Sequence, residues 1–361
     1  MRRRGKISDG STAYPFSSTP GDLVIMSWSG RLVSLCGASL LVFSSTFASA
    51  KDVSIAAISG YFAQGFGVSI VNGLKKAEKD LGVKVKLIDT GNRSLDYEEQ
   101  FNNVAKDGSY DLVFVMGWEL VDALKKTADA YPKTKFVFID GVLDSKNIIY
   151  ANFAQNEGSF VAGALGALMA EKGSKVAGLG DGKAIGFVGG RDLPVIRDFL
   201  AGYTQGAKTA AADVRVDPVF AGTFDDPAKG SELTMALYGQ GSDIVFNVAG
   251  PTGEGVLQAS SSANKYSIGV DIDQCDVAPG HVMASMLKHA DVAVYNLIKD
   301  VVDGKSPEPG SVHTYDLKSG GVELLLCPQV ADKIPADVKS KLDELKGEVT
   351  SGKIKVDTTT K

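Results

Sequence analysis

Acidic and basic side chains stand near the ends of apolar segments that predict β-strands. Asp140 follows segment 135–139, Asp271 follows 266–270, and Lys288 lies further along, on a predicted helix. Carboxylates accept strong hydrogen bonds from hydroxyl groups, and a lysine can pair with the carboxylates or with a ligand. These residue types therefore indicate a site that holds a small polar molecule.

Aromatic and small residues occupy equivalent places after other predicted strands. Phe66 begins the helix after the first strand, Trp118 follows the third strand, and Phe224 follows the sixth. Aromatic rings stack on flat ligands, and ligands of open α/β sheets bind outside the carboxyl ends of the strands. We therefore predict that a polar molecule with a flat ring is bound by Ser59, Phe66, Trp118, Asp140, Phe224, Asn247, Gly250, Asp271 and Lys288.

Each of these residues also has a purely structural interpretation. Phe66 could hold its helix to the sheet, and Phe224 could cover its own lobe. Asp140 and Asp271 could be helix N-caps, and Lys288 could be a solvated helix residue. An unpaired charge in a cleft is costly, so the acids and the lysine are best explained by a ligand or by one another.

The residues that enzymes use are sparse. The histidines are His281, His289 and His313, and none has the spacing of a metal site. The chain has no G-x-S-x-G motif and no phosphate-binding G-x-x-x-x-G-K-S/T loop. A glycine-rich segment at 178–183 precedes a strand, which predicts a turn. We expect a protein that is not an enzyme and needs no cofactor or metal.

Strand-like and helical segments alternate along the chain. Alternation of this kind predicts an α/β fold with parallel sheets covered by helices on both faces. Strands are expected at 53–58, 83–88, 111–116, 135–139, 184–188, 214–220, 243–248 and 266–270. Helices are expected at 66–81, 95–105, 119–130, 158–170, 194–212, 227–239, 253–263 and 283–302.

The alternation restarts after the fourth strand, which predicts two doubly wound lobes. We assign 51–154 and about 272–310 to an N-terminal lobe, and 155–271 and about 311–345 to a C-terminal lobe. No Ser/Pro-rich linker separates them, so the chain should cross between the lobes more than once and form a hinge. Residues 346–361 are expected to form a tail that is frayed from Ser351.

The first 50 residues read as a signal peptide. An apolar segment from Leu32 is followed by Ala48-Ser49-Ala50, a typical cleavage site, and Met26 is a plausible true start. Leu35 precedes Cys36, which is a poor lipoprotein context. A freely diffusing exported protein needs an outer membrane to retain it, so we expect a cleaved chain, without a lipid anchor, in a Gram-negative periplasm.

The net charge of the chain bears on which kinds of molecule it could bind. Five of the 38 basic and two of the 43 acidic residues lie in residues 1–50, so the remainder is acidic. This argues against nucleic acid as a partner.

Cys275 and Cys327 are the cysteines that remain after cleavage of the predicted signal peptide. They could form a disulfide in an oxidising compartment or remain two separate thiols.

Several motifs together resemble the basic membrane protein (BMP) family of ABC-transporter substrate-binding proteins, which includes the purine nucleoside receptor A lipoproteins. They are Phe-Val-Phe-Ile-Asp140-Gly, Gln155-Asn-Glu-Gly-Ser-Phe160, Gly186-Phe-Val-Gly-Gly190, Thr223-Phe224-x-Asp226-Pro227, Val248-Ala-Gly250-x-Thr252, Ile268-Gly-Val-Asp271-x-Asp273-Gln274 and Ser285-Met-x-Lys288. The resemblance covers about residues 53–345. It implies a type I periplasmic-binding-protein fold, in which two lobes close on one ligand.

The resemblance also implies roles for individual residues. In nucleoside-binding members one phenylalanine from each lobe sandwiches the base, which matches Phe66 and Phe224. Carboxylates and a lysine hold the ribose, matching Asp140, Asp271 and Lys288, and a glycine like Gly250 allows backbone to approach the ligand. The implied function is a monomer that carries a nucleoside-like solute to an ABC-transporter permease.

One departure leaves the ligand open. Members usually carry an Asp directly after the first strand and an Asp-Asp-Lys-Ser-Phe-Asn segment at the start of the helix. Here these positions read Ser59-Gly60 and Phe62-Ala-Gln-Gly-Phe-Gly67. The base contacts are thus missing. A flavin or other heterocycle, a sugar or polyol, a sensor role, and a nucleoside hydrolase using Asp140 or Asp271 are alternatives.

Overall fold

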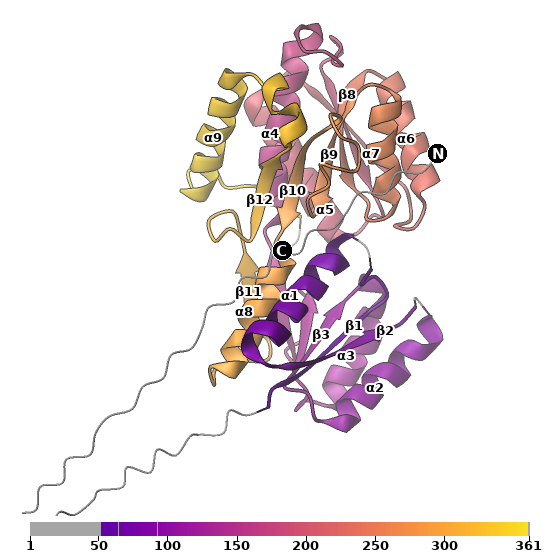
Figure 1. Ribbon diagram of the computed structural model, residues 1–361, viewed down its shortest axis with the longest axis vertical. Coiled ribbons are helices and arrows are strands. Elements are labelled where there is room, and N and C mark those ends of the chain that lie inside the picture. The colour runs from indigo at the N-terminus through magenta and orange to yellow at the C-terminus, as the bar shows by residue number, and fades with distance from the viewer. Residues whose placement is uncertain (1–51, 64, 92, 360–361) are drawn as a thin grey trace, which may run out of the picture. The chain divides into compact units, whose positions relative to one another are not determined.

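The computed structural model describes residues 52–63, 65–91 and 93–359 (Figure 1). The predicted signal peptide, with Met26, Cys36 and the cleavage site, lies outside these residues. Within the part of the chain that is described, no helix is both long and apolar enough to cross a membrane.

The first sheet has the strand order β11-β5-β4-β3-β1-β2, and all its strand pairs are parallel. Its central strands are apolar throughout because helices cover both faces. Helices α1 and α8 pack on one face, and α2 and α3 on the other. The bounds are β1 Ser54–Ser59, β2 Lys84–Asp89, β3 Leu112–Met116, β4 Phe136–Ile139, β5 Ile148–Phe153, β11 Val312–Tyr315, α1 Gly65–Leu81, α2 Tyr97–Asp107, α3 Val121–Ala130 and α8 Ala290–Val302.

The second sheet has the order β12-β10-β9-β8-β6-β7, in which only β12 runs antiparallel. Helices α4, α5 and α9 pack on one face, and α6 and α7 on the other. The bounds are β6 Ala184–Gly189, β7 Arg215–Phe220, β8 Ser242–Val248, β9 Tyr266–Asp271, β10 Val282–Lys288, β12 Val322–Leu326, α4 Gln155–Lys172, α5 Pro194–Ala210, α6 Pro227–Gly239, α7 Thr252–Ser262 and α9 Ala336–Thr350. Short 3₁₀ turns lie at Ser94–Asp96, Trp118–Leu120, Gly173–Lys175 and Pro328–Lys333.

The chain passes between the two sheets three times. It crosses after β5, between β10 and α8, and between β11 and β12. The predicted fold class, two parallel α/β lobes, is confirmed, and so is the expectation of more than one crossing.

Two strands differ from the expectations. Strand β5 was not predicted, and the predicted helix 283–302 is strand β10 followed by α8. Every residue of β10 is buried, and a short segment that is buried on both faces carries no hydrophobic period that separates a strand from a helix. Lys288 therefore ends a strand and does not lie on a solvated helix.

The third crossing also changes which lobe some segments belong to. Strand β10 pairs with β9 in the second sheet, and β11 pairs with β5 in the first. The assignment of 272–310 and 311–345 placed these two strands in the opposite lobes. Helix α8 does pack against α1, as that assignment expected.

The C-terminal segment after α9 is packed, in contrast to the predicted frayed tail. Val356 is buried, and the hydroxyls of Thr358 and Thr359 donate to the carboxylate of Asp198 on α5. The side-chain amide of Asn156 donates to the carbonyl of Asp357 at 3.1 Å. The segment up to residue 359 is thus part of the second lobe.

Cys275 and Cys327 form a disulfide, with their Cα atoms 5.4 Å apart. This separation is usual for the bond. The bridge joins the loop after β9 to the end of β12, so it braces the chain directly beyond Asp271. Of the two alternatives left open by the sequence, the structure has the disulfide.

Candidate ligand-binding site

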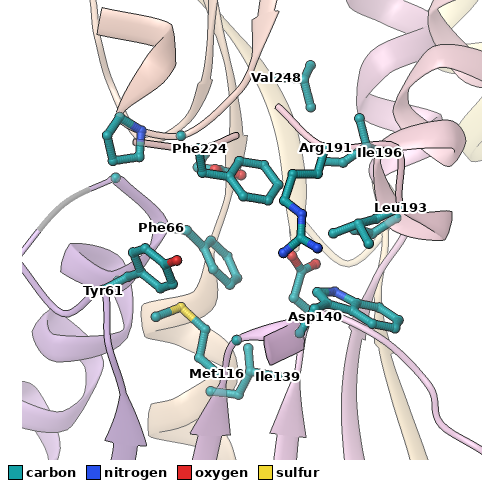
Figure 2. A pocket seen from close by; sticks show the side chains of 18 of the residues that line it. Tyr61, Phe66, Met116, Ile139, Asp140, Arg191, Leu193, Ile196, Phe224 and Val248 are labelled. Atoms are coloured by element: carbon teal, nitrogen blue, oxygen red, sulfur yellow. The ribbon is translucent and has the colours of Figure 1, made fainter. Parts of the chain in front are cut away.

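A pocket takes its lining from strand ends of both sheets (Figure 2). The first sheet contributes residues at or after the ends of β1, β3 and β4, and the second contributes residues at or after the ends of β6, β7, β8 and β9. The space between these residues is about 900 Å³, part of which is open to solvent. Of the predicted site residues, it brings together Phe66, Trp118, Asp140, Phe224, Gly250 and Asp271.

The aromatic rings of the pocket are held from behind. Phe66 packs edge-on against Phe153 with ring centroids 5.8 Å apart, and Trp118 packs edge-on against Phe138 at 5.7 Å. A Cβ at Gly190 would collide with the ring of Phe224, so only glycine there lets this ring lie where it does. Phe66 and Trp118 are thus supported by aromatic neighbours, and such support lowers the entropic cost of binding a ligand.

The two strand-end aspartates have the same unusual backbone. Asp140 and Asp271 have φ of 74° and 67°, a left-handed conformation that aspartate tolerates better than most residues. Neither precedes a helix, since β5 follows Asp140 and β10 follows Asp271, so neither is an N-cap. Burial raises the pKa of Asp271 to about 6, against the opposing effect of Lys288. Both carboxylates line the pocket.

Lys288 lies behind this lining, not in it. Its side chain is 1% exposed, and its ammonium group forms an ion pair with Asp140. It also lies over the rings of Phe66, Phe153 and Phe199, at 4.5, 5.2 and 5.2 Å from their centroids. The cation is thus held by a carboxylate and by aromatic faces, which together offset the cost of burying it.

Besides Lys288, two predicted site residues do not line the pocket. Ser59 is buried, and its hydroxyl accepts the backbone N–H of Tyr61 at 3.1 Å. Asn247 is also buried, and its amide donates to the side-chain oxygen of Gln274 at 3.3 Å. Both are at strand ends, as predicted, but their side chains serve the loops around the site.

Three polar pocket residues were missed in the sequence. Tyr61, Glu119 and Arg191 line the pocket beside the predicted residues. Burial raises the pKa of Tyr61 to about 12, and the nearby Glu119 adds to this. Each follows the end of a strand by two or three positions, which is the same signal that identifies Trp118. Glu119 was missed because the sequence pattern predicts it to be the first residue of a helix.

The described residues contain no group of three or more His, Cys, Asp or Glu side chains that could hold a metal ion. The pocket lining presents aromatic rings, carboxylates, a phenol, an indole and a guanidinium group. Such groups can stack on a flat ring and exchange hydrogen bonds with hydroxyl and ring-edge groups.

Comparison with known sequences identifies one family of proteins. The profile of the family described as "ABC transporter substrate-binding protein PnrA-like" matches residues 53–360. A relative from Lactococcus lactis, named ABC transporter nucleoside-binding protein BmpA, is 35% identical over 72% of this chain and 76% of its own length. Basic membrane protein D of Borreliella burgdorferi is 31% identical over 85% of this chain and 88% of its own length.

Solved structures agree on the architecture. A solute-binding protein of an ABC transporter system from Aeropyrum pernix K1 has a TM-score of 0.76 and 27% identity, covering 86% of this chain and 94% of that one. A carbohydrate-transporter solute-binding protein from Agrobacterium radiobacter, in complex with D-arabinose, has a TM-score of 0.56 and 19% identity, covering 82% and 99%. This second likeness is one of fold alone.

Proposed function

We propose that this chain, which belongs to the PnrA-like family of ABC transporter substrate-binding proteins, binds a nucleoside. The family predicted from the sequence is thereby confirmed, and its members are solute-binding proteins and not enzymes. We further propose that the chain acts as a monomer in a Gram-negative periplasm and delivers its ligand to the transporter's permease.

One observation carries the choice of ligand. Phe66 is the second residue of helix α1 in the first lobe, Phe224 precedes helix α6 of the second, and both line one pocket (Figure 2). A flat base between two such rings gains stacking energy from both lobes. Each aromatic contact contributes about 0.5–1.5 kcal/mol beyond the area that it buries.

The carboxylates support the ribose part of the proposal. Asp140 and Asp271 come from different sheets and line the same pocket. Ionised carboxylates only accept hydrogen bonds, so they suit the hydroxyl groups of a sugar. Lys288 neutralises part of their combined charge and orients Asp140 through the ion pair. A nucleoside joins a flat ring to such a polyhydroxylated group, whereas a sugar lacks the ring.

The proposed mechanism of binding is closure of the two lobes on the ligand, because the residues that contact the ligand come from both lobes. Because the ligand touches residues of both lobes, it binds most tightly when the lobes close on it, and this differential affinity stabilises the closed state. The three chain crossings supply the hinge.

A thermal-shift screen tests this proposal. Protein stripped of ligand by unfolding and refolding is mixed with nucleosides, free bases, riboflavin, pentoses and polyols. We expect the melting temperature to rise with at least one nucleoside and not with free ribose. A shift with a pentose or polyol, and with no nucleoside, would instead favour the sugar-binding alternative.

A further inference from the structure

A short irregular segment follows α9 and lies along helices α4 and α5 of the second lobe. We call residues 354–359 the C-terminal strap. The side-chain amide of Gln205 on α5 donates to the carbonyl of Lys355 at 3.1 Å and accepts the N–H of Asp357 at 2.7 Å. The amide of Asn156 on α4 donates to the carbonyl of Asp357 at 3.1 Å. Side chains of both helices therefore bind the backbone of the strap.

The last residues of the strap contact a buried carboxylate. Asp198 of α5 is 2% exposed. Its Oδ1 accepts hydrogen bonds from the hydroxyls of Thr358 and Thr359, both at 2.8 Å, and from the N–H of Thr359 at 2.6 Å. Its Oδ2 accepts the side-chain amide of Gln155 at 3.2 Å. Burying a carboxylate is costly unless it is hydrogen-bonded, so these donors fix where Asp198 lies.

Asp198 stands next to residues that form the ligand pocket. Ile196 and Phe199, its neighbours on α5, both line the pocket, and Figure 2 shows Ile196 there. The ring of Phe199 also faces the ammonium group of Lys288, which lies 5.2 Å from the ring centroid. Because Ile196, Asp198 and Phe199 share one helical turn, the hydrogen bonds of Asp198 also hold one wall of the pocket in place.

The same carboxylate reaches the first chain crossing. Gln155 is the first residue of α4 and directly follows that crossing. A Cβ at Gly202 would collide with the carbonyl of Asn156, so only glycine there lets α5 lie against the first turn of α4. One buried carboxylate thus joins the strap, a wall of the pocket and the start of the helix that follows the hinge.

We propose that Asp198 is a positioning residue for ligand binding and that the C-terminal strap holds it in place. The strap and Gln155 keep the pocket face of α5 fixed relative to the first crossing, so this wall is already placed when the lobes close. A wall that is free to move must be ordered by the ligand, which lowers affinity. The inference rests on the proposed binding of a nucleoside and adds a residue that does not itself line the pocket.

Calorimetry on the full-length, ligand-stripped protein tests the role of the strap. The probes are adenosine, inosine, riboflavin and D-ribose. The double variant Thr358→Val and Thr359→Val removes two hydroxyl donors from a charged acceptor, and we expect affinity to fall by about fivefold or more. Thr358→Ser and Thr359→Ser together keep both hydroxyls and should bind as the wild type does.

A matched control removes threonine hydroxyls elsewhere in the same lobe. The hydroxyls of Thr209 on α5 and Thr350 on α9 donate to carbonyls of their own helices. The double variant Thr209→Val and Thr350→Val should keep the affinity within about twofold of the wild type. Asp198→Ala, which removes the acceptor itself, should weaken binding at least as much as the loss of the two strap hydroxyls.

The affinities separate a positioning role from a purely stabilising one. Well below the melting temperature every variant that folds is almost fully folded, so lost stability alone leaves the measured affinity unchanged. Unchanged affinity in the strap valine variant overturns the proposal, and so does an equal loss of affinity in the strap serine variant.

Hydrogen exchange of the unliganded protein tests the same claim without a ligand. Amides of α5 and of the first turns of α4 should exchange faster in the strap valine variant than in the control variant, because their local opening becomes easier. Amides of α6 and α7, which cover the other face of the sheet, should exchange as in the wild type. Unchanged exchange in α5 overturns the proposal.

The choice of probes lets this inference and the proposed function fail separately. If the wild type binds riboflavin or D-ribose and neither nucleoside, the nucleoside proposal fails, and the affinities of the variants for that probe still decide the role of Asp198. If the wild type binds none of the four probes, hydrogen exchange decides it.

Discussion

The ammonium group of Lys288, at the end of β10 in the second sheet, forms an ion pair with Asp140, which follows β4 of the first sheet. The pair therefore joins the two lobes at the pocket. The lysine is almost fully buried, and the carboxylate is 20% exposed. This relationship orients one of the two acceptors that we assign to the ligand's hydroxyl groups.

Replacing Lys288 should lower the stability of the folded protein. In Lys288→Met the carboxylate of Asp140 loses its cation, and we expect the free energy of unfolding to fall by about 3 kcal/mol. Lys299→Met is the control, because its ion pair with Asp303 is on the surface and should contribute under about 1 kcal/mol. Urea unfolding without ligand measures both, and equal losses would contradict the structural role of Lys288.

Ligand affinity should depend on pH through Asp271. Burial raises the pKa of this carboxyl to about 6, so it is increasingly protonated below that pH. Because only the ionised form accepts hydrogen bonds from two hydroxyl groups, affinity should rise from pH 5 to pH 7.5. Titration calorimetry at both values, on the wild type and on Asp271→Asn, checks this. A variant with the same pH dependence would contradict the assignment.

Asp271 should also make the stability of the unliganded protein depend on pH, but here stability falls as the pH rises. The folded state binds the proton of Asp271 more tightly than the unfolded state does, since its pKa lies above the ordinary 3.8. Its contribution to stability therefore falls as the pH rises from about 3.8 to about 6. Asp271→Asn should remove this fall from the pH profile of urea unfolding, whereas a profile like the wild type's would argue against it.

His289, which follows Lys288 at the second crossing, should contribute stability at low pH. Its Nε2 lies 3.2 Å from Glu323 of the second sheet, and its Nδ1 lies 3.8 Å from Asp291 of α8. Asp291 raises the pKa of His289 above the ordinary 6.5, burial opposes this, and Glu323 adds to the rise. The stabilisation is present below pH 6.5 and is lost as the pH rises through the raised pKa.

His289→Gln tests this because it keeps a polar side chain without the charge. The difference in unfolding free energy between the wild type and the variant should be larger at pH 5.5 than at pH 8.5. His313→Gln is the control, since His313 lies on β11 and its ring contacts the hydroxyl of Ser311. A constant difference across this range would show that the charge of His289 has no such effect.

Reduction of the Cys275–Cys327 disulfide should destabilise the second lobe. The bridge spans 52 positions of sequence, and closing a loop of that size restricts the unfolded chain by about 4 kcal/mol. Urea unfolding with and without a reductant measures the effect. The double variant Cys275→Ser and Cys327→Ser should match the reduced protein and not respond to the reductant, and a response there would point to another cause.

The sequence predicted which residues gather in the pocket where their place at the end of a strand determines their position. Phe66, Phe224, Asp140 and Asp271 lie in the pocket because parallel strands bring their carboxyl ends to one edge. Ser59 and Asn247 also end strands, but successive side chains of a strand point to opposite faces, and theirs turn toward neighbouring loops.

Three other features could not be predicted from the local sequence pattern. Strand β10 is buried on both faces, so its hydrophobic pattern does not alternate and could not distinguish it from the start of α8. Glu119 lines the pocket because Gly117 makes room for its carboxylate, which is a matter of backbone conformation at the neighbouring position. The expected fraying of the C-terminus failed because Asp198, far away in sequence, binds Thr358 and Thr359.

The most direct test of the central claim is the affinity of ligand-stripped protein for a nucleoside and for free ribose, measured by calorimetry on the wild type, Phe66→Ala and Phe224→Ala. If the base is held between the two rings, a nucleoside binds the wild type, ribose does not, and each variant weakens nucleoside binding by about tenfold or more. Ribose binding as tight as the nucleoside's, with both variants unaffected, would contradict the account.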